Sequence, residues 1–262
     1  MNSILLHEVK GKSEILTFNT PEKLNVLSEE MLKEFSVALS KCAANQTTHV
    51  VILRSTGKAF CAGHDLKQMQ NERNNPDKGL KYFNKLFNQC SKVMMQIKNL
   101  PKPVVAEVQG VATAAGCQLV ATCDIAVASK NAKFGVNGVN IGLFCSTPMV
   151  ALSRNIGRKK TFEMLVTGDF MTASEAKESG LINHVVNEEE LSAKTDELAS
   201  KISKKFKRVV KIGKKAFYEQ NEMKLEDAYD YTAKIMAENM VLEETIEGIS
   251  AFIEKRNPKW TE

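Results

Sequence analysis

The chain has 262 residues, of which 43% are hydrophobic and 26% charged, and its formal net charge is +5. This is the composition of a globular protein with enough residues for one large core, or for a core with an appended region. No run of about 18 apolar residues occurs and the N-terminus lacks a signal-peptide pattern, so we expect neither a membrane span nor secretion.

The excess of positive charge suits a nucleic acid, an acidic lipid or a polyanionic cofactor. No RNP, zinc-finger or helix-turn-helix signature accompanies it, so nucleic acid is not the expected partner. The six cysteines form no CxxC pair, and no two histidines stand at metal-ligand spacing. We therefore expect reduced thiols in a cytoplasmic protein that has no metal site.

Up to about residue 187, predicted strands alternate with predicted helices, which favours an α/β fold with crossover connections. The expected strands are 4–9, 13–18, 49–54, 104–108, 124–129 and 181–186. The expected helices are 28–42, 80–100, 114–123, 149–156 and 158–167. Ser28–Met31 and Thr172–Glu175 are interpreted as capping boxes. The polar segment 64–76 is expected to be a mobile loop, and 134–148 a long connection that carries function.

Helical periodicity dominates from residue 188 to the end. The helices expected there are 190–204, 206–219, 224–240 and 242–255. The sequence thus predicts two domains: a core at 1–187 that carries the ligand site, and a helical region at 188–262.

Two segments rich in small residues stand out, Ala59–Leu66 and Gly110–Gln118. Each is an apolar strand that ends in small residues and runs into a predicted helix. Small residues let a backbone approach a ligand closely, and the start of a helix offers unpaired N–H donors. Two such turns meeting at one point would form an oxyanion hole, which stabilises an enolate or a tetrahedral intermediate.

These two segments and three others resemble, in the same order, motifs of the crotonase or enoyl-CoA hydratase/isomerase superfamily. The other three are Asn19–Leu27, Thr167–Leu181 and Glu247–Arg256. The resemblance implies a crotonase (ClpP-like) α/β fold, with a spiral core of repeated ββα units and a C-terminal helical region that forms trimers. It also implies acyl-CoA thioester substrates and a homotrimer or a dimer of trimers.

The resemblance assigns roles to individual residues by motif position. The backbone N–H groups of His64 and Ala115 match the oxyanion-hole donors. The residues that match the adenine contacts of coenzyme A are Ala62, Asp65 and Leu66. The residues that match the contacts with its phosphates are Lys67 and Lys255. The second lysine often comes from a neighbouring subunit. No tightly bound cofactor is implied, because coenzyme A arrives as part of the substrate.

Hydratases of this superfamily use two glutamates to add water across a double bond, one as acid and one as base. Here the first position is Gln118 and the second, by count, is Gly138. The side chain of Gln118 has two possible roles: it positions a water or the substrate, or its polar atoms form hydrogen bonds only with backbone groups. Asn137 and Asn140 either bind a polar group or shape a turn.

A second set of candidates lies on the connection after residue 134, where other superfamily members place alternative catalytic groups. These are Cys145, Ser146 and Thr147. As a nucleophile, Cys145 has no evident base in the sequence.

The sequence therefore predicts an acyl-CoA-binding enzyme of this superfamily, nominally an enoyl-CoA hydratase (a lyase) of fatty acid metabolism. Its oxyanion hole is expected to be present and its two usual glutamates are missing. The alternatives are a crotonase that is not a hydratase, such as a decarboxylase or a thioesterase, and a catalytically inert acyl-CoA-binding protein.

Overall fold

The structure is a computed structural model that describes residues 3–260. The chain forms two compact units that divide between Ser200 and Lys201. The division into domains expected after residue 187 stays a prediction. None of the helices in the described part of the chain is long and apolar enough to cross a membrane.

The first unit contains a six-stranded sheet in the order β1-β2-β3-β5-β7-β10. Its strands are β1 (Leu5–Lys10), β2 (Ser13–Phe18), β3 (Val50–Ser55), β5 (Val104–Val108), β7 (Ile125–Ser129) and β10 (His184–Val186). β1 and β2 form an antiparallel hairpin, and all later pairs are parallel. Parallel pairs need crossover connections, so the alternation of strands and helices in the sequence is confirmed.

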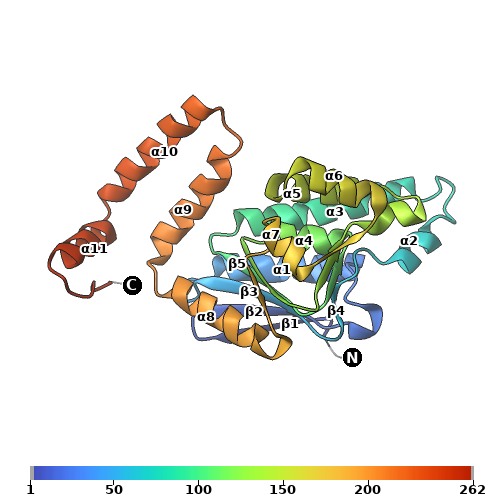
Figure 1. The fold of residues 1–262 in the computed structure, drawn as a ribbon, viewed down its shortest axis with the longest axis horizontal. Coiled ribbons are helices and arrows are strands. Elements are labelled where there is room, and N and C mark those ends of the chain that lie inside the picture. Colours follow the sequence, from blue (N-terminus) through green and yellow to red (C-terminus); the bar gives the residue numbers. More distant parts are fainter. Residues whose placement is uncertain (1–2, 261–262) are drawn as a thin grey trace. The chain divides into compact units, whose positions relative to one another are not determined.

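Helices cover the six-stranded sheet (Figure 1). The helices α1 (Glu29–Ala44), α3 (Leu80–Asn99) and α4 (Ala115–Thr122) lie over one face, and α8 (Leu191–Ser203) lies at the other. On the first face, Phe18 of β2 and Phe35 of α1 are fully buried with ring centroids 5.1 Å apart. On the second, Ser192 of α8 donates to Glu107 of β5 at 2.9 Å.

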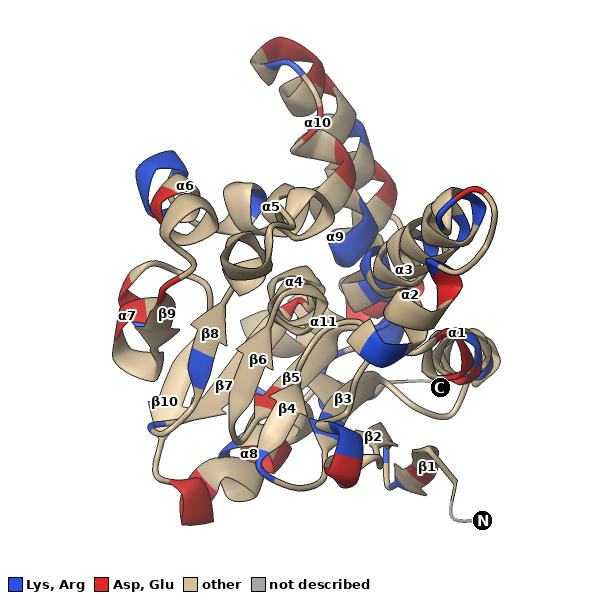
Figure 2. Ribbon diagram, turned by 90° about the vertical axis from the view of Figure 1, so that its right-hand side faces the viewer, with Lys and Arg blue, Asp and Glu red and all other residues tan. Residues whose placement is uncertain are grey.

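A second sheet places the ends of three strands at one edge. Its order is β4 (Ala59–Cys61), β6 (Val111–Thr113), β8 (Lys133–Gly135) and β9 (Phe170–Thr172). β4, β6 and β8 are parallel and lie side by side (Figure 2). The segments that follow these strands therefore leave the sheet at the same edge.

Shorter elements complete the first unit: the 3-10 turns η1 (Pro21–Lys23), η2 (Asn137–Ile141) and η3 (Glu188–Glu190), and the helices α2 (Leu66–Glu72), α5 (Ser146–Asn155), α6 (Arg158–Thr167) and α7 (Ala173–Glu178). The second unit contains α9 (Lys207–Gln220), α10 (Leu225–Met240) and α11 (Glu243–Ile253). The expected C-terminal helices are thus confirmed to within two residues at each end.

Two local expectations are wrong. Residues 66–72 form a helix rather than a loop, because Asp65 Oδ1 accepts from the N–H groups of Lys67 (3.0 Å) and Gln68 (3.1 Å) and so caps its first turn. At α1, Ser28 Oγ accepts from Met31 N–H at 3.1 Å, but methionine at this position cannot complete a capping box. The box at Thr172 and Glu175 is confirmed.

Asn25 ties the loop after β2 to the start of β4. It is fully buried in a left-handed conformation with φ of 53°. Its Oδ1 accepts from Thr20 N–H at 2.9 Å, and its Nδ2 donates to the carbonyls of Thr56 (2.7 Å) and Ala59 (2.9 Å). Asparagine suits this place because it tolerates positive φ and carries both a donor and an acceptor.

Replacing Asn25 by Ala leaves backbone groups buried without partners, so we expect Asn25→Ala to lower the free energy of unfolding by about 3 kcal/mol. Asn84→Ala, at an exposed position of α3, is the matched control and should change it by less than about 0.5 kcal/mol. Chemical denaturation measures both, and equal effects of the two substitutions would contradict this role of Asn25.

Candidate active site

The turn after β4 lies against the turn that begins α4. Gly63 has φ of 91°, and a Cβ built on it would lie 3.0 Å from Ala114 Cβ and 3.4 Å from the backbone nitrogen of Ala115. The parallel pairing of β4 with β6 explains this contact, because both turns leave the same sheet edge. The two small-residue segments of the sequence therefore meet.

The start of α4 is packed too closely for a side chain. A Cβ on Gly116 would lie 2.1 Å from the carbonyl oxygen of Cys61, so only glycine fits. Ala114, the residue before the helix, has φ of 49° and ψ of −120°, a strained conformation without a side-chain cap. Strain of this kind is held in place by surrounding structure and is found at functional sites.

Two backbone N–H groups at the meeting point are available to a ligand. Neither the N–H of His64 nor that of Ala115 donates to an acceptor within residues 3–260. The Ala115 N–H belongs to the first turn of α4, where the helix has no partner for it and where its dipole favours negative charge.

The imidazole of His64 is neutral and turned toward the core. Its Nδ1 lies 3.2 Å from the carbonyl oxygen of Leu27 and therefore carries the hydrogen. Its Nε2 is buried without a partner among the described residues, and burial lowers the pKa of the ring. The ring packs edge-on against the ring of Phe87, with 5.5 Å between the two ring centroids. The structure therefore does not offer a charged imidazole here, and the role of the His64 backbone stays a prediction.

Gln118 lies one turn into α4 and is only 5% exposed. Its Oε1 is buried and has no hydrogen-bond partner in the described part of the chain. A buried acceptor is normally paired, so this oxygen is suited to a water or substrate donor. Backbone does not satisfy it.

Gly138 has no room for a side chain. A Cβ at this position would lie 2.3 Å from the carbonyl oxygen of Leu143 and 2.8 Å from Cys145 Sγ. Leu143 N–H donates to Gly138 O at 2.9 Å and holds the loop there. Burial raises the pKa of the Cys145 thiol, which keeps it protonated and a poor nucleophile. The position at which the second glutamate was expected is thus closed by the loop that follows η2.

The asparagines of this region have separate surroundings. Asn137 Oδ1 accepts from Thr113 Oγ1 at 2.6 Å, which fixes the end of β6 to the start of η2. Asn140 is exposed, and its side chain lies against Gly168. The sequence analysis assigned no role to Thr113, although this residue lies within Gly110–Gln118, or to the carbonyl of Leu143, because no motif position points to either group. Ser146 is exposed and Thr147 half-buried at the start of α5.

Four of the residues expected to bind coenzyme A lie in or just after the turn that follows β4. Ala62 N–H donates to Leu24 O at 3.1 Å, and Asp65 caps α2. Leu66 is 53% exposed, and Lys67 is also exposed. Lys255 belongs to the second unit, where it is exposed with φ of 54°. Their roles at coenzyme A stay predictions.

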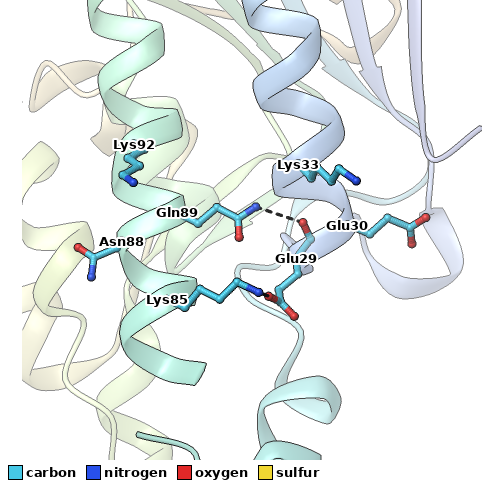
Figure 3. A pocket seen from close by; sticks show the side chains of 7 residues that line it. All are labelled: Glu29, Glu30, Lys33, Lys85, Asn88, Gln89 and Lys92. Carbon is cyan, nitrogen blue, oxygen red and sulfur yellow. Dashed lines mark hydrogen bonds and ion pairs between the residues drawn. The ribbon is translucent and has the colours of Figure 1, made fainter. Parts of the chain in front are cut away.

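A hollow of about 680 Å³ lies between α1 and α3 (Figure 3). Its lining is charged, and the ion pair of Lys85 Nζ with Glu29 Oε1 at 2.7 Å closes one end. Gln89 Nε2 donates to Glu29 O at 3.3 Å across the gap. Neither turn of the candidate site contributes to this lining, so the hollow is separate from the candidate site.

Replacing Gly138 by Ala forces the Leu143 carbonyl and the Cys145 thiol aside. We expect Gly138→Ala to destabilise the fold by about 1–3 kcal/mol in chemical denaturation. Gly157→Ala is the control, because a Cβ there meets nothing within 4 Å, and its effect should stay below about 0.5 kcal/mol. A Gly138→Ala protein as stable as the wild type would show that the loop after η2 can shift without loss of stability.

Comparison with known proteins identifies the family of the chain. The model of the enoyl-CoA hydratase/isomerase family matches residues 12–262. The mitochondrial enoyl-CoA hydratase domain-containing protein 3 of Mus musculus is 45% identical over 246 residues, which cover 94% of this chain and 80% of that protein.

Two crystal structures are similar over nearly the whole chain. Enoyl-CoA hydratase of Mycobacterium smegmatis is 48% identical with a TM-score of 0.95, and covers 99% of each chain. Human enoyl coenzyme A hydratase domain-containing protein 3 is 43% identical with a TM-score of 0.93, and covers 98% of this chain and 100% of that one. The expected crotonase fold is confirmed, and the chain belongs to the enoyl-CoA hydratase/isomerase family.

Proposed function

We propose that this protein binds acyl-CoA thioesters and acts on them by stabilising negative charge on the thioester oxygen. The contact between Gly63 and the Ala114–Ala115 turn supports this proposal, because Gly63 directly precedes His64 and the two turns that carry the His64 and Ala115 N–H groups therefore lie against each other. An enolate or a tetrahedral intermediate accepts from both donors, and the N-terminal end of α4 adds its dipole.

The same site argues against hydration by the usual pair of glutamates. Gln118 cannot exchange a proton at neutral pH, and Gly138 has neither a side chain nor space for one. What remains at the site is the buried Gln118 oxygen, which accepts a hydrogen bond and so orients a water or a substrate group. Reactions that depend mainly on oxyanion stabilisation, such as decarboxylation or thioester hydrolysis, depend less on the two missing glutamates.

The basic character of the chain supports coenzyme A as the anionic part of the ligand. The adenine is expected at the backbone of Ala62, Asp65 and Leu66, and the phosphates at Lys67 and Lys255. The formal net charge of +5 favours the approach of such a polyanion.

We further propose a homotrimer or a dimer of trimers as the working assembly. In the second unit, the large apolar side chains of Leu225, Tyr229 and Phe252 are between 70% and 85% exposed. Apolar surface of this kind marks an interface. A mass of three or six chains of 29.1 kDa in light scattering is the expected result, and a single-chain mass would contradict it.

The cellular location stays a prediction. The mouse relative is named mitochondrial, which points away from the expected cytoplasm, whereas the Mycobacterium smegmatis relative is bacterial.

Incubation with a panel of acyl-CoA thioesters, followed by mass spectrometry, tests the reaction. A gain of one water identifies hydration, a loss of one CO₂ identifies decarboxylation, and free coenzyme A identifies hydrolysis. Hydration of crotonyl-CoA at ordinary enzymatic rates would refute our interpretation of Gln118 and Gly138. Binding without any conversion would support the alternative that the protein is a catalytically inert acyl-CoA-binding protein.

Removal of one N–H group tests the oxyanion hole itself. Proline lacks this donor, so we expect an Ala115→Pro protein that keeps the wild-type circular dichroism to show a kcat lower by about 10²–10³-fold. Arg158→Pro makes the same change at the first position of α6 and should leave kcat unaltered. An Ala115→Pro protein with wild-type kcat would rule out this donor.

A further inference from the structure

A cluster of three metal-ligating side chains lies apart from the active site. It consists of His7 on β1, Glu14 on β2 and Cys42 near the end of α1. His7 pairs with Leu16 across the hairpin, so Glu14, two residues away, is its diagonal neighbour on the same face. α1 packs over this face and adds the thiol.

The three ligand atoms converge on one point. His7 Nε2 lies 2.8 Å from Glu14 Oε2 and 3.9 Å from Cys42 Sγ, and all three atoms lie within 4.8 Å of one another. In a tetrahedral zinc site, ligand bonds of about 2.0–2.3 Å place neighbouring ligand atoms about 3.3–3.8 Å apart. Side-chain rotations that move each atom by about 1 Å therefore reach this geometry.

The arrangement is that of a metal site rather than of a hydrolytic triad. In a triad, the histidine uses its two ring nitrogens for two different partners. Here Glu14 and Cys42 both face the same nitrogen, Nε2. Burial raises the pKa of the Cys42 thiol, so the sulfur is uncharged until an ion displaces its proton.

Other side chains hold the carboxylate of Glu14 in place. Lys102 Nζ donates to Glu14 Oε1 at 3.0 Å, and Thr48 Oγ1 donates to the same oxygen. Burial alone would raise the pKa of Glu14, but its hydrogen bonds, from Thr48, Lys102, Cys42 and His7, outweigh burial and bring it to about 2. The Lys102 ammonium lies at Oε1, and Oε2 faces His7.

We propose that His7 Nε2, Glu14 Oε2 and the Cys42 thiolate bind one Zn²⁺ ion, with a water as the fourth ligand. The His7 side chain is 27% exposed, which gives the ion and the water a way in, whereas Glu14 is 1% exposed. Binding breaks the S–H bond of Cys42, releases that proton to solvent and forms the Zn–S bond. The hydrogen that His7 Nε2 donates to the Glu14 carboxylate must also leave this nitrogen, so the ring carries its hydrogen at Nδ1 when Nε2 binds the ion. The site does not depend on the proposed acyl-CoA activity, and it departs from the expectation of no metal site.

Metal titration of the full-length, chelator-treated protein tests the site. We expect one Co²⁺ ion per chain with a thiolate-to-metal absorption band in the near ultraviolet, and displacement of Co²⁺ by Zn²⁺. Cys42→Ala should abolish the band. His7→Ala changes a partly exposed side chain and should weaken Zn²⁺ binding at least about tenfold in competition with a chromophoric chelator.

Two matched variants serve as controls. Cys90→Ala removes a buried thiol from α3, and His184→Ala removes a histidine from β10, the opposite edge strand of the sheet. Both should bind the ion as the wild type does, with unchanged circular dichroism. A wild-type protein that binds neither ion, or a folded His7→Ala protein that binds Zn²⁺ equally well, would overturn the proposal and leave a hydrogen-bonded cluster only.

Discussion

The candidate site depends on the parallel pairing of β4, β6 and β8. Because these strands run the same way, the segments that follow them meet at one edge of the second sheet. One brings His64, the next brings Ala115 and Gln118, and the third brings Gly138. Ligands of parallel sheets are found at this edge, beyond the carboxyl ends of the strands. No single segment could form the site alone.

Close packing at this edge explains why its residues are small. The carbonyl oxygen of Cys61 occupies the space of any Cβ at position 116, and Ala114 lies within contact distance of Gly63. The backbone can thus present N–H groups where a side chain would otherwise stand. The cost is strain at Ala114 and dependence on neighbours such as Asn25, whose side chain holds the start of β4.

The same packing distinguishes this site from one that adds water with two carboxylates. At Gly138 the loop that follows η2 occupies the space that a side chain would need, and the Leu143 carbonyl and the Cys145 thiol lie there. A single substitution to glutamate would therefore meet backbone rather than an open cavity. This arrangement offers two backbone N–H groups and one buried amide oxygen that have no partner among the described residues.

The sequence by itself determined the family, the order of most helices and strands, and the identity of the residues at the two turns. These follow from local patterns: hydrophobic periodicity, capping residues such as Thr172, and motifs of consecutive residues. It missed α2, because a polar, Asn-rich segment resembles a loop unless the cap at Asp65 is given more weight than composition.

Only the tertiary structure decided what lies beside each turn. The contact of Gly63 with Ala115, the closed space at Gly138 and the unpaired oxygen of Gln118 depend on residues from different elements. The cluster of His7, Glu14 and Cys42 has no regular spacing in the chain, and it exists because a hairpin and a helix pack together. Local sequence patterns reflect the conformation that neighbouring residues prefer. These contacts, in contrast, depend on how segments that are distant in the sequence pack together.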